Sequence, residues 1–593
     1  MEIYSTSTAN ASYAGVIKAE FFGKVRECFK FYKEHKQQYD RRIIDNNNWY
    51  KSRYMSDPDS NIPEPATPYL FNVIANKHAD AMDNYPEPNI LERSEGDRQL
   101  AEKLTKILPM QLDICDFKKT YSRAWWYKLK NGASCYGVFF NPTLNNGAGD
   151  IDIKKIDLLN LFWEPGITDI QDSRFVFLTA LVDNSELKLK YPEHADKFTG
   201  SAAIEVMTYD DMQNTKNNDA LKDKSVVVDC YYKKSRGNRT TVELIKFYDD
   251  TILAASEDSG ENGIYDHGIY PFVFDVLYPD EDSPVGFGLV DIVKNPQLYI
   301  DKLDSIISKN ALISGKTRFM IKDNGGLNEY ELTDLNSDII HVAGSVGDEN
   351  IRELQANPLH NFIIEHRQNK ILELKEIAGN RDFQQGGTSG GVTAYSAIVA
   401  LQQAGEKLAR DMLIESYNSF KSIVYLCIEL MRQFYNSPRS YRINCENGSC
   451  EYISFTGREL NKSGYPGGEH YHPVEFDVSV SGEKNNPYSR IAQNQTLTEL
   501  WQMGVFNPEQ AESAILLLES MHLDGKEKLI EGIKGLRDGY EEKLAAAGAI
   551  KENKETNNGK ETSQIKLGGE NSYSSSAEPL RSATQITPSV SRI

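Results

Sequence analysis

Apolar positions in the first 132 residues recur mainly at helical spacing. They predict a long, partly exposed helix over 13–54 and a helix of about four turns over 69–84, which Pro86 and Pro88 should end. Two further helices should follow, with a break near Pro109. The first part of the chain is therefore expected to be helical.

Beyond Asn131-Gly132 the apolar residues alternate with polar ones, and turn signals separate the runs. Strands are predicted at Ser134–Phe140, Ile151–Ile156, Phe175–Leu181, Val226–Lys233, Thr241–Phe247, Tyr452–Phe455 and Glu475–Ser481. Residues 210–224 are rich in Asn, Asp and Lys and are expected to form an exposed acidic loop. Helices and short strands occupy different stretches, which indicates an α+β fold.

Two Asn-Pro pairs mark a pair of helices in the middle of the chain. Asn295-Pro296 and Asn357-Pro358 each combine a capping residue with proline at the first helical position. Heptad-like spacing in the first helix predicts one packed face, formed by Tyr299, Leu303, Ile306, Asn310 and Ile313. Because strand-like runs lie between the helices, an antiparallel hairpin with a small module at its tip is expected.

A second face of the first helix is basic. Lys302, Lys309 and Lys316 recur every seven residues, about 10 Å apart along the helix axis. Most such stripes are an ordinary solvated face, and contacts to an anion are the alternative.

The segment 381–391, RDFQQGGTSGG, has four glycines and predicts a mobile loop. A helical pattern without proline follows over 392–435, and it would span roughly 60 Å. A helical region over 489–547 is expected to end the folded part. Residues beyond Lys551 include few large apolar side chains, which predicts a disordered tail.

Composition limits the classes of function. Of the 593 residues, 40% are hydrophobic and 26% are charged, which is typical of folded proteins. The 66 basic and 86 acidic residues give a net charge of −20, which argues against tight non-specific nucleic-acid binding. Seven scattered cysteines favour reduced thiols. Neither a secretion signal nor an apolar run of about 20 residues is present, so no membrane association is expected.

The short motifs that resemble catalytic sites each lack a required feature. Ser314-Gly315-Lys316-Thr317 ends like a phosphate-binding loop, but Asn310 stands where that motif needs glycine. The run 387–391 matches G-x-S-x-G and would make Ser389 a hydrolase nucleophile, yet a predicted helix precedes it where a strand is required. No set of nucleophile, base and orienting group can be assembled. The sequence therefore argues against an enzyme, and no cofactor is expected.

Four residues provide a weak candidate metal site. Its ligands would be Cys445, Cys450, His470 and His472. These residues have suitable zinc chemistry but loose spacing. Free thiols and loop histidines are the simpler interpretation.

Three segments carry a family resemblance. They are NGASCYGVFF followed by IDIKKIDLLNLFWEPG (131–140 and 151–166), YPFVFDVLYPDEDSPVGFGLVDIVKNPQLYIDKLDSIISKN (270–310) and GGTSGGVTAYSAIVALQQAGEKLARDM (386–412). With the order of the predicted elements, they resemble the portal (head–tail connector) proteins of tailed bacteriophages. The resemblance implies the following parts: N-terminal wing 1–286, first stem helix 287–313, small α/β clip 314–356, second stem helix 357–379, channel loop 380–391, long wing helix 392–435, wing strands 436–488, crown-like helices 489–550 and disordered tail 551–593.

The resemblance also implies a function and partners. Portals form a ring, usually of twelve subunits, at the unique capsid vertex, and double-stranded DNA passes through it during packaging and ejection. Expected partners are the terminase large subunit, adaptor or neck proteins, and the major capsid and scaffolding proteins, with the chain in the host cytoplasm during assembly and in the virion afterwards. Candidate residues of the channel are Lys302, Lys309, Arg381, Gln384, Gln385, Gly386, Gly387, Thr388, Ser389, Gly390 and Gly391. The alternatives are a serine hydrolase that uses Ser389 and another structural ring component of a virion.

Overall fold

The computed structural model divides the chain into two compact units, Met1–Asn485 and Asn486–Ile593. It describes residues 17–54, 67–198, 223–236, 239–259, 263–314, 318–321, 351–354, 359–379, 407–444, 450–462, 472–473 and 476–484 of the first unit, and 497–500, 502, 511–520, 529–530 and 532–539 of the second. The predicted acidic loop, apart from its last two residues, and the predicted tail lie outside these ranges.

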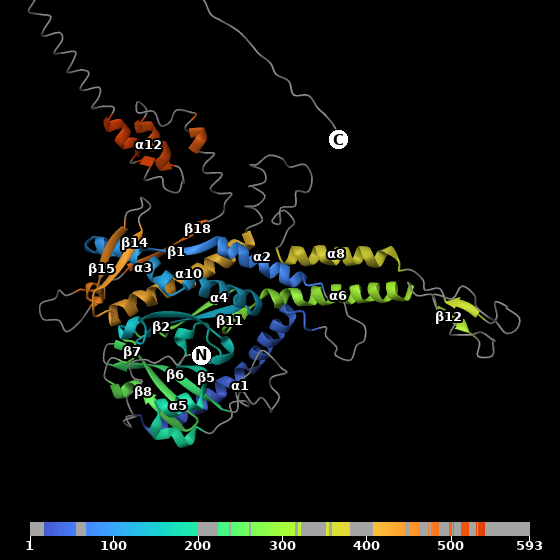
Figure 1. Ribbon diagram of the computed structural model, residues 1–593, viewed down its shortest axis with the longest axis horizontal. Helices are drawn as coiled ribbons and strands as arrows, with labels where there is room; N and C mark the ends of the chain where they lie inside the picture. The colour runs from blue at the N-terminus through green and yellow to red at the C-terminus, as the bar shows by residue number, and fades with distance from the viewer. Residues whose placement is uncertain are drawn as a thin grey trace, which may run out of the picture. The chain divides into compact units, whose positions relative to one another are not determined.

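Helices and strands alternate in long blocks, as an α+β fold requires (Figure 1). The helices are α1 (Ala19–Tyr50), α2 (Tyr69–Asp83), α3 (Arg98–Ile114), α4 (Phe117–Asn131), α5 (Asn184–Lys190), α6 (Leu289–Ser314), α8 (Asn361–Ile377), α10 (Lys407–Phe434) and α12 (Ala511–Ser520). The strands are β1 (Asn84–Glu92), β2 (Ala133–Asn141), β3 (Asp150–Ile156), β4 (Leu161–Phe162), β5 (Phe175–Asp183), β6 (Lys224–Arg236), β7 (Arg239–Tyr248), β8 (Thr251–Ala255), β9 (Phe272–Val276), β10 (Tyr278–Asp280), β11 (Ser283–Phe287), β12 (Arg318–Ile321), β13 (Ile351–Leu354), β14 (Arg439–Asn444), β15 (Cys450–Phe455), β16 (Asn461–Lys462), β17 (His472–Pro473) and β18 (Phe476–Lys484). All seven predicted strands are confirmed, with boundaries that shift by a few residues.

A five-stranded antiparallel sheet, in the order β4-β5-β6-β7-β8, is covered by helices on both faces. On one face α1 packs its aromatic residues against the sheet, and the ring of Phe29 lies 5.2 Å from that of Phe177 and 5.4 Å from that of Phe162. On the other face Leu187 of α5 packs against Val227 of β6. The alternation of apolar residues in β6 thus serves two small cores.

The main core of the first unit lies around a three-stranded sheet in the order β3-β2-β9. The helices α4 and α10 contact this sheet, and they contribute buried residues such as Trp125, Phe420 and Met431. The side chains of Lys128 on α4, Asp275 on β9 and Ser416 on α10 meet in its interior. One buried polar contact therefore joins three elements of this core.

The predicted end of a helix before Pro86 and Pro88 is confirmed, because α2 ends at Asp83, but the sequence does not predict the strand β1 that follows. Its nine residues pair antiparallel with β18, from Asn84 opposite Lys484 to Glu92 opposite Phe476. The N–H of Ile90 donates to Thr105 Oγ1 at 3.0 Å, so it points away from β18. Positions 86 and 88 share that outward side because a strand alternates with period two, and their missing N–H groups cost no bond to β18.

The predicted break near Pro109 is wrong. The helix α3 continues through Pro109 to Ile114, and its residues Leu104, Ile107, Leu108 and Leu112 are buried. The break comes at Asp116, whose φ of +52° is left-handed. Burial of the apolar face of α3 thus outweighs the hydrogen bond that an internal proline removes.

The second unit has a small core of its own. In α12 the residues Ala511, Ala514 and Leu518 are buried and form a cluster with Leu500 and Ile533. No helix among the described residues of either unit is long and apolar enough to cross a membrane.

Candidate functional site

The helices α6 and α8 lie side by side (Figure 1) and are called the two-helix arm below. The predicted start of α6 at Asn295-Pro296 is wrong, because the helix begins at Leu289 and Pro296 lies inside it. Its first two turns bury Val290 and Val293 in the main core, and this burial outweighs the cost of an internal proline. The Gly288 N–H donates to Asp291 Oδ2 at 2.9 Å at this end of the helix.

Polar side chains hold the inner face of α6. Gln297 and Asp301 are buried, and Gln297 Nε2 donates to both carboxylate oxygens of Asp301 at 3.0 Å and to Thr67 O at 2.7 Å. The Tyr54 hydroxyl also donates to Asp301. Burial raises the pKa of Asp301, and its hydrogen bonds oppose that shift. These contacts fix α6 to the chain around residues 54 and 67.

A salt bridge joins the two helices of the arm. The guanidinium of Arg367 on α8 forms a bidentate contact with Asp304 on α6, with 3.0 Å between Arg367 Nη2 and Asp304 Oδ2. The hydrogen bonds with Asp304 raise the pKa of Arg367 above its ordinary value. At the end of α8, Gly379 has a φ of +63°, and its carbonyl accepts a bond from Lys77 at 3.4 Å. The predicted stop at Gly379-Asn380 is therefore confirmed at its glycine.

The expected packed face of α6 is largely uncovered within one chain. Leu303 is 9% exposed, but Tyr299 and Ile306 are 47% and 49% exposed. Apart from Leu303, the buried residues lie mainly on the opposite face and include Ile300 and Gln297. Other exposed apolar residues of the arm are Leu312, Phe362, Ile364, Leu372 and Ile377. A cluster of exposed apolar side chains of this kind is typical of an interaction surface.

Lys302 and Lys309 are exposed on α6, on the side that carries Ile306. Neither ammonium has an ion-pair partner among the residues that the structure describes. Seven residues separate them, which is a rise of about 10 Å. The remaining candidate channel residues all lie outside the described ranges: Arg381, Gln384, Gln385, Gly386, Gly387, Thr388, Ser389, Gly390 and Gly391. Lys316 of the basic stripe does too.

The candidate zinc ligands do not form a site in the described part of the chain. Cys445 and His470 lie outside it, and Cys450 and His472 belong to the different strand pairs β14-β15 and β16-β17. Over the described ranges, no three His, Cys, Asp or Glu side chains gather closely enough to hold a metal ion.

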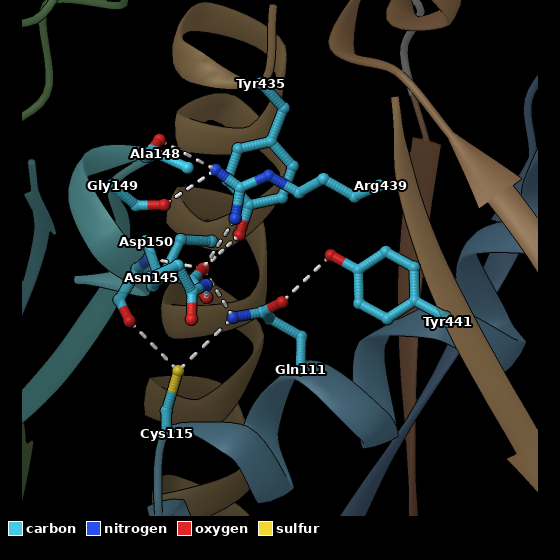
Figure 2. Close-up of polar contacts among 10 residues, drawn as sticks. Gln111, Cys115, Asn145, Ala148, Gly149, Asp150, Tyr435, Arg439 and Tyr441 are labelled. Atoms are coloured by element: carbon cyan, nitrogen blue, oxygen red, sulfur yellow. Dashed lines mark hydrogen bonds and ion pairs between the residues drawn. The ribbon is translucent and has the colours of Figure 1, made fainter. Parts of the chain in front are cut away.

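Sequence reasoning missed a buried polar cluster around Asp150, which lies where α10 ends (Figure 2). Asp150 Oδ1 accepts bonds from Gln111 and Tyr435, and Oδ2 accepts one from Asn145. The distances are 2.9 Å to Gln111 Nε2, 2.5 Å to Tyr435 Oη, 2.6 Å to Asn145 Nδ2 and 3.3 Å to Arg439 Nη1. The cluster thus joins α3, the turn before β3, the end of α10 and the start of β14.

The Asp150 cluster has the properties of a structural joint. Burial raises the pKa of Cys115 to about 12, so this thiol stays protonated and unreactive near neutral pH. Burial raises the pKa of Tyr435 far above its ordinary value and that of Tyr441 to about 12. The Tyr441 hydroxyl donates to Gln111 Oε1 at 2.9 Å. No sequence motif predicts this cluster, because its residues come from segments that are far apart in the sequence.

The chain matches a known protein family over most of its length. A family model described as "Phage P22-like portal protein" matches residues 34–269 and 282–566. These segments include all of α6, α8, α10 and α12. No curated protein matches the chain.

Proposed function

Because this chain belongs to the phage P22-like portal protein family, whose members are structural components of the virion and form a ring in the capsid, we propose that it is the DNA conduit of that ring. The ring would hold about twelve copies at one capsid vertex. DNA would pass through its centre during packaging and ejection, and the terminase large subunit and then neck proteins would dock on it.

The exposed apolar surface of the two-helix arm is the observation that carries this proposal. Tyr299, Ile306 and Phe362 are 47%, 49% and 71% exposed in the single chain. In a ring, the arm of the next copy would cover them, since each subunit meets two neighbours through heterologous contacts. On this interpretation α6 and α8 are the two stem helices, and 314–356 between them is the clip.

The mass of the purified protein tests the ring. About twelve copies of a 67.0 kDa chain give a particle of roughly 0.8 MDa, and negative-stain images of the same peak should show a central hole. Light scattering supplies the mass. A compact dimer or tetramer without a hole would count against the conduit.

One variant connects the ring with the arm. Ile306→Asp should keep the stability of the single chain, because the side chain is already half exposed, and should reduce ring formation at least about tenfold. Leu189→Asp is the matched control, since Leu189 is 87% exposed but lies on α5, outside the arm. Equal ring yields from the two variants would show that this face of the two-helix arm does not form a contact between subunits.

Lys302 and Lys309 are proposed to make weak contacts with phosphates of the passing DNA, as are Arg381, Gln384 and Gln385 of the loop 380–391. An acidic conduit with a few cations suits this task, because strong counterion-release affinity would stop the duplex from sliding.

A Lys302→Gln/Lys309→Gln variant should form rings of normal mass and retain less packaged DNA. Each phosphate contact that is lost should lower the slope of log DNA affinity against log salt by about 1. Packaging assays on assembled capsids measure the retained DNA, and Lys188→Gln on α5 is the control with an exposed lysine elsewhere. Normal retention by the double variant would show that these lysines do not act on DNA.

A further inference from the structure

Four cations gather where α1, α4 and β3 meet. Lys51 follows α1, Arg123 and Lys130 lie on α4, and Lys155 lies on β3. The helix α4 packs against both of the other elements. Lys130 and Lys155 are half-buried, whereas Lys51 and Arg123 are exposed. These four residues are called the Lys130 cluster.

Aromatic rings hold the two half-buried ammonium groups. Lys130 Nζ lies 4.8 Å from the ring centroid of Tyr50, and Lys155 Nζ lies 3.8 Å from that of Tyr127. Neither ammonium forms an ion pair with any carboxylate in the described ranges. The contacts with the rings are attractive, but they do not neutralise the charge.

The cations of the cluster repel one another. Burial, together with the positive charges of Lys155 and Lys51, lowers the pKa of Lys130 to about 8, and the charge of Asp157 partly opposes this shift. Burial also lowers the pKa of Lys155, and Arg123 contributes to that shift, again against Asp157. At pH 7 Lys130 remains mostly protonated, so the single chain holds partly desolvated like charges together at a cost in stability.

We propose that the Lys130 cluster is one side of a contact between subunits and that carboxylates of a second copy of this chain cover it. The inference rests on the proposed ring and names a surface within it. Each copy carries 86 acidic and 66 basic residues, so a neighbouring copy supplies the complementary charge. A ring closes through heterologous contacts, so this patch meets a different face of the next copy and not its own equivalent.

This role predicts opposite effects on the single chain and on the ring. Removing the charges relieves repulsion in the separate subunit, so its melting temperature should stay the same or rise. The same change removes attraction across the interface, so assembly should weaken. A cluster that only supported the fold would show a lower melting temperature as its main effect.

The test uses a full-length Lys130→Met/Lys155→Met variant. Light scattering over a range of protein and salt concentrations should show that half-assembly needs about tenfold more protein and depends less on salt. Lys130→Arg/Lys155→Arg keeps the charges and should assemble normally. Lys119→Met, which alters an exposed lysine on the same helix, should also assemble normally.

Several outcomes would overturn the proposal. Unchanged assembly of the methionine variant beside a wild-type ring overturns this contact alone, whereas a wild-type chain that forms no ring overturns it together with the proposed function. A lower melting temperature of the separate variant subunit assigns the cluster to the fold. If inorganic phosphate or a short DNA duplex stabilises the wild-type subunit and not the variant, while assembly is equal, the cluster binds phosphate instead.

Discussion

A Lys128→Met variant should lose about 3–5 kcal/mol of its free energy of unfolding. Lys128 Nζ lies 2.6 Å from Asp275 Oδ1, and the two side chains are 0% and 1% exposed. Ser416 Oγ donates to Asp275 Oδ2 at 2.7 Å, and the ammonium also lies 3.4 Å from Met412 O. Without the ammonium, Asp275 would remain a buried carboxylate whose desolvation one hydroxyl cannot offset. Urea unfolding followed by tryptophan fluorescence measures the loss.

Two controls separate the lost charge from the lost packing. A Lys128→Met/Asp275→Leu variant removes both charges and should recover most of the stability. Arg98→Met removes an exposed ion pair with Glu102, whose partners are 70% and 63% exposed, and should cost less than about 1 kcal/mol. Equal losses from Lys128→Met and Arg98→Met would contradict the buried pair.

Gly288→Ala should destabilise the chain by about 3 kcal/mol or more and should reduce ring yield. A Cβ at Gly288 would lie 2.5 Å from Lys130 O and 2.8 Å from Gly132 N, so the end of α4 or the start of α6 must move. Gly132 faces it with a φ of +91°, and a Cβ there would lie 2.4 Å from the Phe287 carbonyl carbon. The atoms in conflict belong to the backbone, and no side-chain rotation relieves them.

Gly23 supplies the matched control. It lies in α1, and a Cβ there meets nothing within 4 Å. Gly23→Ala should therefore stabilise the chain by about 0.5–1 kcal/mol, because alanine favours a helix interior more than glycine does. Thermal unfolding measures the stability of both variants, and negative-stain images give their ring yields. Gly288→Ala should lower both quantities, whereas Gly23→Ala should lower neither. A neutral Gly288→Ala would show that the approach of α4 and α6 is loose.

Sequence patterns predicted elements well where one physical signal dominates. Alternation placed β2 and β5 to within two residues, and Gly379 marked the end of α8 because its conformation suits glycine. They failed where a distant partner decides the outcome. Pro86 and Pro88 correctly follow the end of α2 at Asp83, but nothing in the local sequence shows that Thr105 and β18 make the next segment a strand. Pro296 likewise reads as a helix start, but the main core extends α6 by seven residues.

The candidate site was predicted in part. The seven-residue spacing correctly placed Lys302 and Lys309 on one exposed face, because helix geometry fixes that relation. Heptad spacing could not show that Tyr299 and Ile306 stay uncovered in one chain, because the pattern does not distinguish an internal core from a subunit contact. The Asp150 cluster and the Lys130 cluster both arise from contacts between distant segments, which no local motif records.

The pairing of β1 with β18 has a consequence for biosynthesis. About 400 residues separate the two strands, so β1 leaves the ribosome long before its partner exists. At about 5–20 residues per second, the wait is roughly 20–80 s. Throughout that time the β18 side of β1 offers unpaired N–H and C=O groups to other nascent chains, while Pro86 and Pro88 limit pairing on the opposite side. In a polysome, where many copies are made close together, the prolines thus leave only one edge of β1 open to pairing with a neighbouring chain until β18 is made.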